Sequence, residues 1–168
     1  IQELTKSADI ILLQETWLLE FELHTLSTIH LDFYGKGFTA VDIENQSING
    51  RGRYGGIAIM WRKTLGHMCR IISFNDPRIM GIIIQNDKGS EFQVLNVYMP
   101  TSCNQNSDEF LYYLSMIEGA ISAFQSPLSF VFGDLNAHIS HTGHDNHLFG
   151  QGLLKFCNDE NLVLSDLD

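Results

Sequence analysis

The feature that most constrains the fold is a series of short apolar runs separated by turn-rich stretches. The runs of strand length are rich in β-branched residues or phenylalanine, and they occupy residues 10–13, 57–61, 79–84, 92–98, 129–132 and 162–164. Most of them are apolar at successive positions, which is typical of strands that are covered on both faces. Alternation of such runs with helical segments predicts an α/β fold.

Two segments have the spacing of amphipathic helices. Ser107 is a candidate N-cap, Asp108 and Glu109 suit a first turn, and Pro127 ends the pattern. The apolar stripe of this helix is Phe110, Leu114, Ile117, Ile121 and Phe124. The second helix is predicted over residues 148–160, with Leu153, Phe156 and Cys157 on its apolar face. The residues before Ile10 read as the tail of another helix.

The intervening segments predict loops and one hairpin. Residues 31–53 are polar and contain several glycines, so we expect loop there. Residues 86–90 form a turn-rich stretch of hairpin length between the runs at 79–84 and 92–98. An antiparallel hairpin beside crossover connections predicts mixed sheets.

Composition places the chain among single-domain globular proteins. The chain has 168 residues, of which 44% are hydrophobic and 18% are charged, so it can bury a core. The first apolar stretch, residues 10–13, is too short and too soon followed by Glu15 to be a signal or membrane segment. The three cysteines, Cys69, Cys103 and Cys157, are far apart and suggest neither a disulfide framework nor a zinc site. We therefore expect one intracellular domain over residues 1–168.

The net charge of −10 argues against a protein whose affinity depends on neutralising many phosphates. It argues less against an enzyme, because carboxylates that hold a divalent cation add to the acidic count. Arg51 and Arg53 lie in a glycine-rich stretch and are candidate DNA contacts, with ordinary solvated charges as the alternative. The run His138, His141, His144 and His147 is more simply read as a solvated loop than as a metal site.

Polar groups follow three of the apolar runs at the points where strands should end. They are Glu15, Tyr98, and Asp134 with Asn136. This set suits metal-assisted phosphoryl chemistry, because Mg²⁺ takes one or two carboxylates and accepts phosphate oxygens. Asp134 could activate a water, Asn136 could hold that water or a phosphate oxygen, and Tyr98 could donate to developing charge. The alternative for 134–136 is a local Asx turn.

Four motifs resemble those of the endonuclease/exonuclease/phosphatase superfamily, in the same order across almost the whole chain. They are Leu-Gln-Glu-Thr-Trp (13–17), Tyr-Gly-Gly-Ile-Ala-Ile (54–59), Asn-Val-Tyr-Met-Pro (96–100) and Gly-Asp-Leu-Asn-Ala-His (133–138). The last motif, together with Asn146, Gly150 and residues 153–164, is most similar to the apurinic/apyrimidinic-like endonuclease domain of LINE-type non-LTR retrotransposons.

The resemblance implies a deoxyribonuclease-I-like α/β sandwich of two mixed sheets with helices outside. It implies that Glu15 is the metal ligand, Tyr98 the phosphate-contacting tyrosine, Asp134 the water-activating acid and Asn136 its partner. The family also uses an Asn on an earlier strand, a later Asp and a closing Ser-Asp-His. Ser165-Asp166-Leu167 does not supply the last motif, so we expect a fold that is incomplete at both edges.

The function implied by the resemblance is Mg²⁺-dependent nicking of DNA by in-line attack of water, with Mn²⁺ as a substitute metal. A reverse transcriptase domain on the same full-length chain and access to the nucleus are expected of the retrotransposon type, and no membrane association is. A phosphatase of phosphoinositides or other small phosphoesters shares the motifs. A catalytically inactive relic that binds partners or nothing is the third alternative.

Overall fold

The computed structural model describes residues 1, 3–40, 55–101, 106–124, 128–137, 139 and 147–165. The chain divides into two compact units. The first contains Ile1–Tyr98 and Ser126–Asp134, and the second contains Met99–Gln125 and Leu135–Asp168. That the whole chain is one domain stays a prediction.

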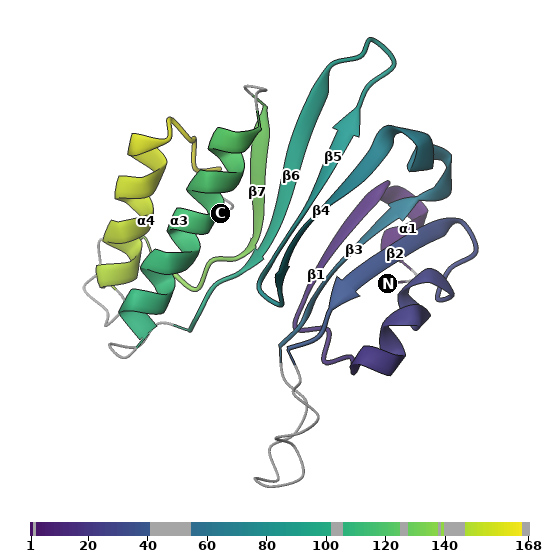
Figure 1. The fold of residues 1–168 in the computed structure, drawn as a ribbon, viewed down its shortest axis with the longest axis horizontal. Helices are drawn as coiled ribbons and strands as arrows, with labels where there is room; N and C mark the ends of the chain where they lie inside the picture. The colour runs from purple at the N-terminus through teal and green to yellow at the C-terminus, as the bar shows by residue number, and fades with distance from the viewer. Residues whose placement is uncertain are drawn as a thin grey trace, which may run out of the picture. The chain divides into compact units, whose positions relative to one another are not determined.

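The described residues of the first unit form two sheets (Figure 1). One sheet has the strand order β1-β3-β2, and both of its pairings are antiparallel. Its strands are β1 (Ile10–Gln14), β2 (Phe33–Phe38) and β3 (Ile57–Arg62). The prediction of two mixed sheets was therefore wrong for this one.

The other sheet is mixed and has the order β4-β5-β6-β7. Its strands are β4 (Cys69–Asp76), β5 (Ile79–Gln85), β6 (Glu91–Tyr98) and β7 (Ser129–Asp134). The hairpin between β5 and β6 is confirmed, and Asn86 Oδ1 closes its turn by accepting from the backbone N–H of Lys88 at 3.0 Å and of Ser90 at 2.9 Å. β7 joins β6 in parallel.

The two sheets share one apolar core. It is formed by side chains from β3, β5 and β6, namely Ile57, Ile59, Met80, Ile82, Ile84 and Val94. β3 and β5 are buried almost throughout, which confirms that their continuous apolar runs are covered on both faces. β7 differs, because Phe130 and Phe132 are 44% and 52% exposed.

Two predictions about where strands form were wrong, and glycine explains one of them. Residues 33–38 were expected to be loop but form β2. A Cβ on Gly35 would stand 2.4 Å from the carbonyl oxygen of Leu26, so this glycine allows close backbone contact and does not mark a loop. The strand predicted at 162–164 does not form, although those residues are described.

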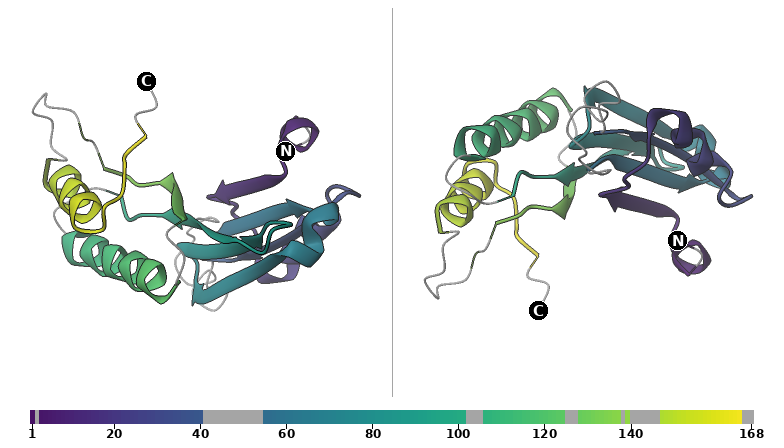
Figure 2. Two further views of the ribbon diagram at one scale, coloured as in Figure 1. Left: turned by 90° about the horizontal axis from the view of Figure 1, so that it is seen from above. Right: turned by 90° about the horizontal axis from the view of Figure 1, so that it is seen from below.

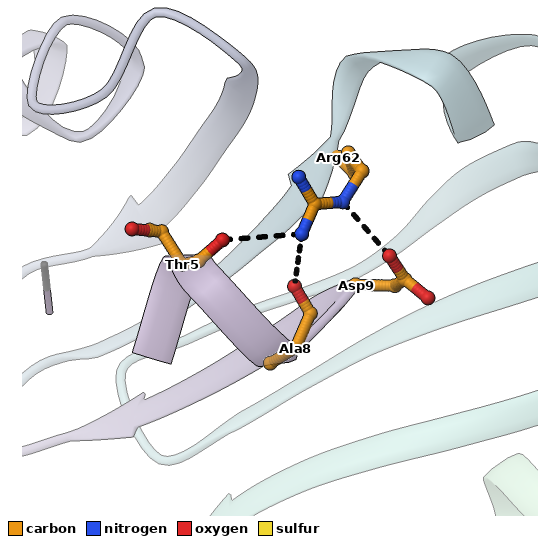
Figure 3. A network of polar contacts seen from close by, with 4 residues as sticks. All are labelled: Thr5, Ala8, Asp9 and Arg62. Carbon is orange, nitrogen blue, oxygen red and sulfur yellow. Dashed lines mark hydrogen bonds and ion pairs between the residues drawn. The ribbon is translucent and has the colours of Figure 1, made fainter. Parts of the chain in front are cut away.

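Hydrogen bonds from Arg62 at the end of β3 connect residues 5–9 to the first sheet (Figure 3). Helix α1 (Leu4–Ser7) leads into β1, as the sequence predicted. The Arg62 guanidinium donates to the carbonyl oxygens of Thr5 and Ala8 at 3.1 and 3.0 Å and to Asp9 Oδ1 at 2.8 Å. The guanidinium thus satisfies carbonyls at the end of α1. The described residues of this unit also form two short 3-10 helices, η1 (Glu20–Ser27) and η2 (Lys63–Met68).

The second unit contains the two predicted helices, α3 (Ser107–Ala123) and α4 (His147–Asp159), which lie side by side (Figure 2). The rings of Phe110 and Phe149 stack between them, with centroids 4.2 Å apart. The predicted cap was wrong by one residue, because Asn106 occupies the N-cap position and Ser107 begins the helix. No helix in the described part of the chain is long and apolar enough to cross a membrane.

Candidate active site

Three of the predicted site residues meet at one edge of the first unit. Tyr98 is the last residue of β6, Asp134 is the last residue of β7, and the parallel register pairs the two directly. Glu15 follows β1 of the other sheet. The Tyr98 hydroxyl donates to Glu15 Oε1 at 2.6 Å, so strand ends from both sheets are joined at this point.

The backbone at Glu15 departs from strand geometry. Glu15 and Trp17 have φ values of 51° and 54°, a region that costs a non-glycine residue about 1–3 kcal/mol. The segment is held by two backbone hydrogen bonds, from Thr16 to Gly56 at 3.3 Å and from Trp17 to Gly55 at 2.9 Å. Gly55 and Gly56 therefore have a local function, which is to anchor the turn that presents Glu15.

Gly133 fixes the position of Asp134. It has a φ of 139°, and a Cβ at this position would stand 1.8 Å from the carbonyl oxygen of Val97. Only glycine allows β7 to approach β6 this closely.

Tyr98 is held in its protonated form. Its pKa is raised to about 12, chiefly by burial, then by the hydrogen bond to Glu15 and the charge of Glu15, and less by the charge of Asp134, while Arg78 acts in the opposite direction. A phenol with this pKa remains a hydrogen-bond donor through neutral pH. The group can therefore donate to an anionic substrate.

Arg78 belongs to the surroundings of Tyr98 but was not predicted. Its guanidinium carbon lies 5.2 Å from the centroid of the Tyr98 ring, and its Nη1 donates to the Tyr98 carbonyl oxygen at 3.3 Å. The backbone N–H of Tyr98 donates to the Arg78 carbonyl oxygen at 2.8 Å. An arginine in a turn between two strands gives no sequence signal of such a contact, because charged turn residues are ordinarily solvated.

Asn136 is described within the second unit. It has a φ of 47°, and its Nδ2 donates to the carbonyl oxygen of Met99 at 2.8 Å. The predicted partnership of Asn136 with Asp134 stays a prediction. Arg51 and Arg53, the predicted DNA contacts, lie outside the described residues, as do His138, His141 and His144, and the side chain of His147 is not described either.

The donor set at this edge fits a hard divalent cation. Glu15 and Asp134 provide carboxylate oxygens, and Mg²⁺ is held by one or two carboxylates with water and substrate oxygens completing its coordination. Among the described residues, no group of three or more histidine, cysteine or acidic side chains could form an all-protein metal cage. The chemistry of the set therefore suits a cation that is shared with a phosphate.

Comparison with known proteins gives a family and a fold. The model of the Endonuclease/Exonuclease/phosphatase family matches residues 1–166. A search of curated protein sequences finds no significant match.

Among solved structures, the human Nocturnin catalytic domain with bound sulfate is similar at a TM-score of 0.61 and 14% identity, over 94% of this chain and 60% of that one. The Xenopus laevis APE2 catalytic domain is similar at a TM-score of 0.60 and 16% identity, over 92% of this chain and 61% of that one. These likenesses confirm the predicted deoxyribonuclease-I-like class with two sheets. The chain spans about 60% of the length of either domain. The predicted incompleteness at the two edges stays a prediction.

Proposed function

Because the chain belongs to the endonuclease/exonuclease/phosphatase family, we propose that it carries the phosphodiester-cleaving site of a Mg²⁺-dependent DNA endonuclease. The observation that carries the proposal is the 2.6 Å hydrogen bond from Tyr98 to Glu15, at a strand end where Asp134 is in register with Tyr98. A metal-binding carboxylate, a phosphate-directed donor and a candidate base then stand together at one edge.

Each residue has a role in an in-line attack of water on phosphorus, in which the new P–O bond forms as the P–O bond to the leaving nucleotide oxygen breaks, and the leaving alkoxide takes a proton from solvent. Glu15 would hold the cation, which when bound would supply positive charge against the phosphate oxygens. The Tyr98 hydroxyl, which stays protonated at neutral pH, donates to an oxygen on which charge increases in the transition state. Asp134 accepts the proton of the attacking water, and Asn136 orients that water or a phosphate oxygen.

We propose DNA as the substrate and target-site nicking of the retrotransposon type as the biological reaction. The support is the motif resemblance, above all Gly-Asp-Leu-Asn-Ala-His at residues 133–138. A reverse transcriptase domain on the same full-length chain, access to the nucleus and replacement of Mg²⁺ by Mn²⁺ are parts of this proposal. The net charge of −10 is consistent with an enzyme that holds DNA through a metal and few cationic contacts.

Two alternatives remain and can be separated by substrate. A small-phosphoester phosphatase would cleave phosphomonoesters in preference to plasmid DNA, since the same residues handle phosphate and metal in both cases. An inactive relic would fold and cleave neither substrate.

The test is nicking of supercoiled plasmid DNA with and without Mg²⁺. Asp134→Ala is expected to reduce the nicking rate by about 100-fold or more, as loss of a general base does. Asp87→Ala is the matched control, because Asp87 is an exposed residue of the hairpin turn in the same unit. Equal nicking by the two variants would remove Asp134 from the mechanism. Cleavage of phosphomonoesters without nicking would favour the phosphatase.

A further inference from the structure

A buried amide in β6 connects the two sheets close in sequence to Glu15 and Tyr98. Asn96 is 0% exposed, and its Nδ2 donates to the carbonyl oxygens of Leu13 at 3.1 Å and Ala58 at 2.9 Å. Its Oδ1 accepts a hydrogen bond from Gln14 Nε2. Both donor hydrogens and the oxygen of this amide therefore have partners, and all of the partners lie on β1 or β3 of the opposite sheet.

The surrounding core makes these contacts selective. The neighbouring inter-sheet contacts are made by apolar side chains such as Ile59, Met80 and Val94. Apolar contacts are non-directional, whereas hydrogen bonds require particular distances and angles. A shift of β1 along β6 would leave buried polar groups without partners, each at a cost of about 1–3 kcal/mol. The Asn96 amide thus favours one position of β1 relative to β6 over positions that are shifted along the strand.

That placement determines where the metal ligand stands. Leu13 and Gln14 immediately precede Glu15, and Asn96 lies two residues before Tyr98, hence on the same face of β6. Glu15 has a left-handed backbone, which persists only where its surroundings enforce it. The hydrogen bonds of Asn96 fix Leu13 and Gln14, the strand residues that lead into this strained turn.

We propose that Asn96 is a positioning residue of the active site, which fixes β1 so that the Glu15 carboxylate meets the Tyr98 hydroxyl. Asn96 touches neither metal nor substrate and acts through Gln14 and the backbone of Leu13. The inference rests on the proposed function, because it assigns Glu15 to the metal.

The test compares Asn96→Leu with Val94→Ala. Val94 lies two residues earlier on the same face of β6 and is 7% exposed, so its truncation also disturbs the inter-sheet core but leaves the amide contacts in place. We expect Asn96→Leu to raise the Mg²⁺ concentration that half-saturates nicking, and to lower kcat, by about 10- to 100-fold, as loss of a residue that orients a metal ligand does. Val94→Ala should leave the Mg²⁺ dependence unchanged, and neither variant should change KM for DNA by more than about twofold, since neither side chain contacts DNA.

Gln14→Met provides a second variant, which should lower the stability of the fold less than Asn96→Leu does, because Gln14 is only half-buried. It keeps the length of the side chain and removes the donor to Asn96, so a smaller shift in the same direction is expected. The same Mg²⁺ dependence in Asn96→Leu, Gln14→Met and Val94→Ala would overturn the proposal.

A magnetic resonance measurement separates this inference from the proposed function. The nuclear Overhauser contact between the Tyr98 ring and the Glu15 side chain should be present in the unaltered protein and in Val94→Ala, and lost or weakened in Asn96→Leu. Persistence of the contact in Asn96→Leu would overturn the positioning role whether or not the protein cleaves DNA. If the contact is present in the unaltered protein and lost in Asn96→Leu, but the unaltered protein does not cleave DNA, then only the proposed function is contradicted.

Discussion

The Tyr98 hydroxyl donates a 2.6 Å hydrogen bond to Glu15 Oε1, although the two residues are 83 positions apart in the chain. The bond joins the end of β6 to the turn that follows β1 and brings a phenol donor against a carboxylate. In the proposed function, this contact places the Tyr98 hydroxyl beside the carboxylate that would hold the cation.

Tyr98→Phe should preserve the fold and impair cleavage. The variant removes the hydroxyl alone, and loss of one donor to transition-state charge typically lowers kcat by about 100-fold. Single-turnover nicking at saturating Mg²⁺ measures the effect. A variant that cleaves at the rate of the unaltered protein would show that Tyr98 has no part in the chemistry.

The stability of the protein should depend on the ionisation of Tyr98 at alkaline pH. The pKa of Tyr98 is raised from 10.0 to about 12 in the fold, so below pH 10 the phenol is protonated in both the folded and the unfolded chain. As the pH rises from 10 towards 12 the unfolded chain loses this proton first, and the free energy of unfolding falls. Urea midpoints measured across this range should decline less steeply in Tyr98→Phe. Identical slopes for the two proteins would contradict the raised pKa.

Gly133→Ala should be strongly destabilising. The added Cβ would stand 1.8 Å from the Val97 carbonyl oxygen, at a backbone φ of 139° that L-residues avoid. Strain at such a backbone position and displacement of β7 together predict a loss of more than about 3 kcal/mol in the free energy of unfolding. Urea denaturation measures the change.

Gly119→Ala is the control for that substitution. Gly119 lies within α3, and a Cβ there would meet no atom within 4 Å. Alanine should stabilise the helix by about 0.5–1 kcal/mol. Opposite signs for the two substitutions are therefore expected, and a loss of similar size at both positions would show that the close contact at Gly133 is not present in solution.

The exposed aromatic residues of β7 should bind a hydrophobic dye. Phe130 and Phe132 stack with centroids 6.3 Å apart, and Phe132 also lines a hollow of about 540 Å³ with Ile10, Leu12, Gln14, Val94 and Gly133. Exposed apolar surface of this kind marks binding or aggregation sites. Phe132→Ser should lower the dye fluorescence, whereas Leu111→Ser on the exposed face of α3 should not. Equal fluorescence from the two variants would show that β7 is covered in solution.

The sequence predicted those elements in which a local pattern coincides with burial. β3 and β5 contain nearly continuous apolar runs, β6 has the same character apart from Gln93 and Asn96, and the structure buries most residues of all three. β2 was missed because glycines such as Gly35 and Gly37 usually indicate a turn. In the structure they instead allow close backbone contact with Leu26 and Ile57. That use depends on segments distant in the sequence, which no window of neighbouring residues contains.

The same limit applies to the site. Glu15, Tyr98 and Asp134 could be predicted because each follows an apolar run, and the structure places all three at one edge of the first unit. The contact of Arg78 could not, because a charged residue beside a turn carries no local sign of the ring that it packs on across the β5–β6 hairpin. The contacts of Asn96 could not, because they join β6 to strands that are far apart from it in the chain. Asn96 begins the Asn-Val-Tyr-Met-Pro motif, but its role becomes visible only with the carbonyl groups of Leu13 and Ala58 to which it donates.

The most direct test of the central claim is the Mg²⁺ dependence of plasmid nicking by Glu15→Gln. This variant keeps the size of the side chain and its ability to accept from Tyr98, but it removes the charge that binds the cation. We predict that the half-saturating Mg²⁺ concentration rises by at least about 10-fold, as expected for loss of a charged metal ligand. A Mg²⁺ dependence identical to that of the unaltered protein would contradict the assignment of Glu15 and with it the proposed metal-dependent site.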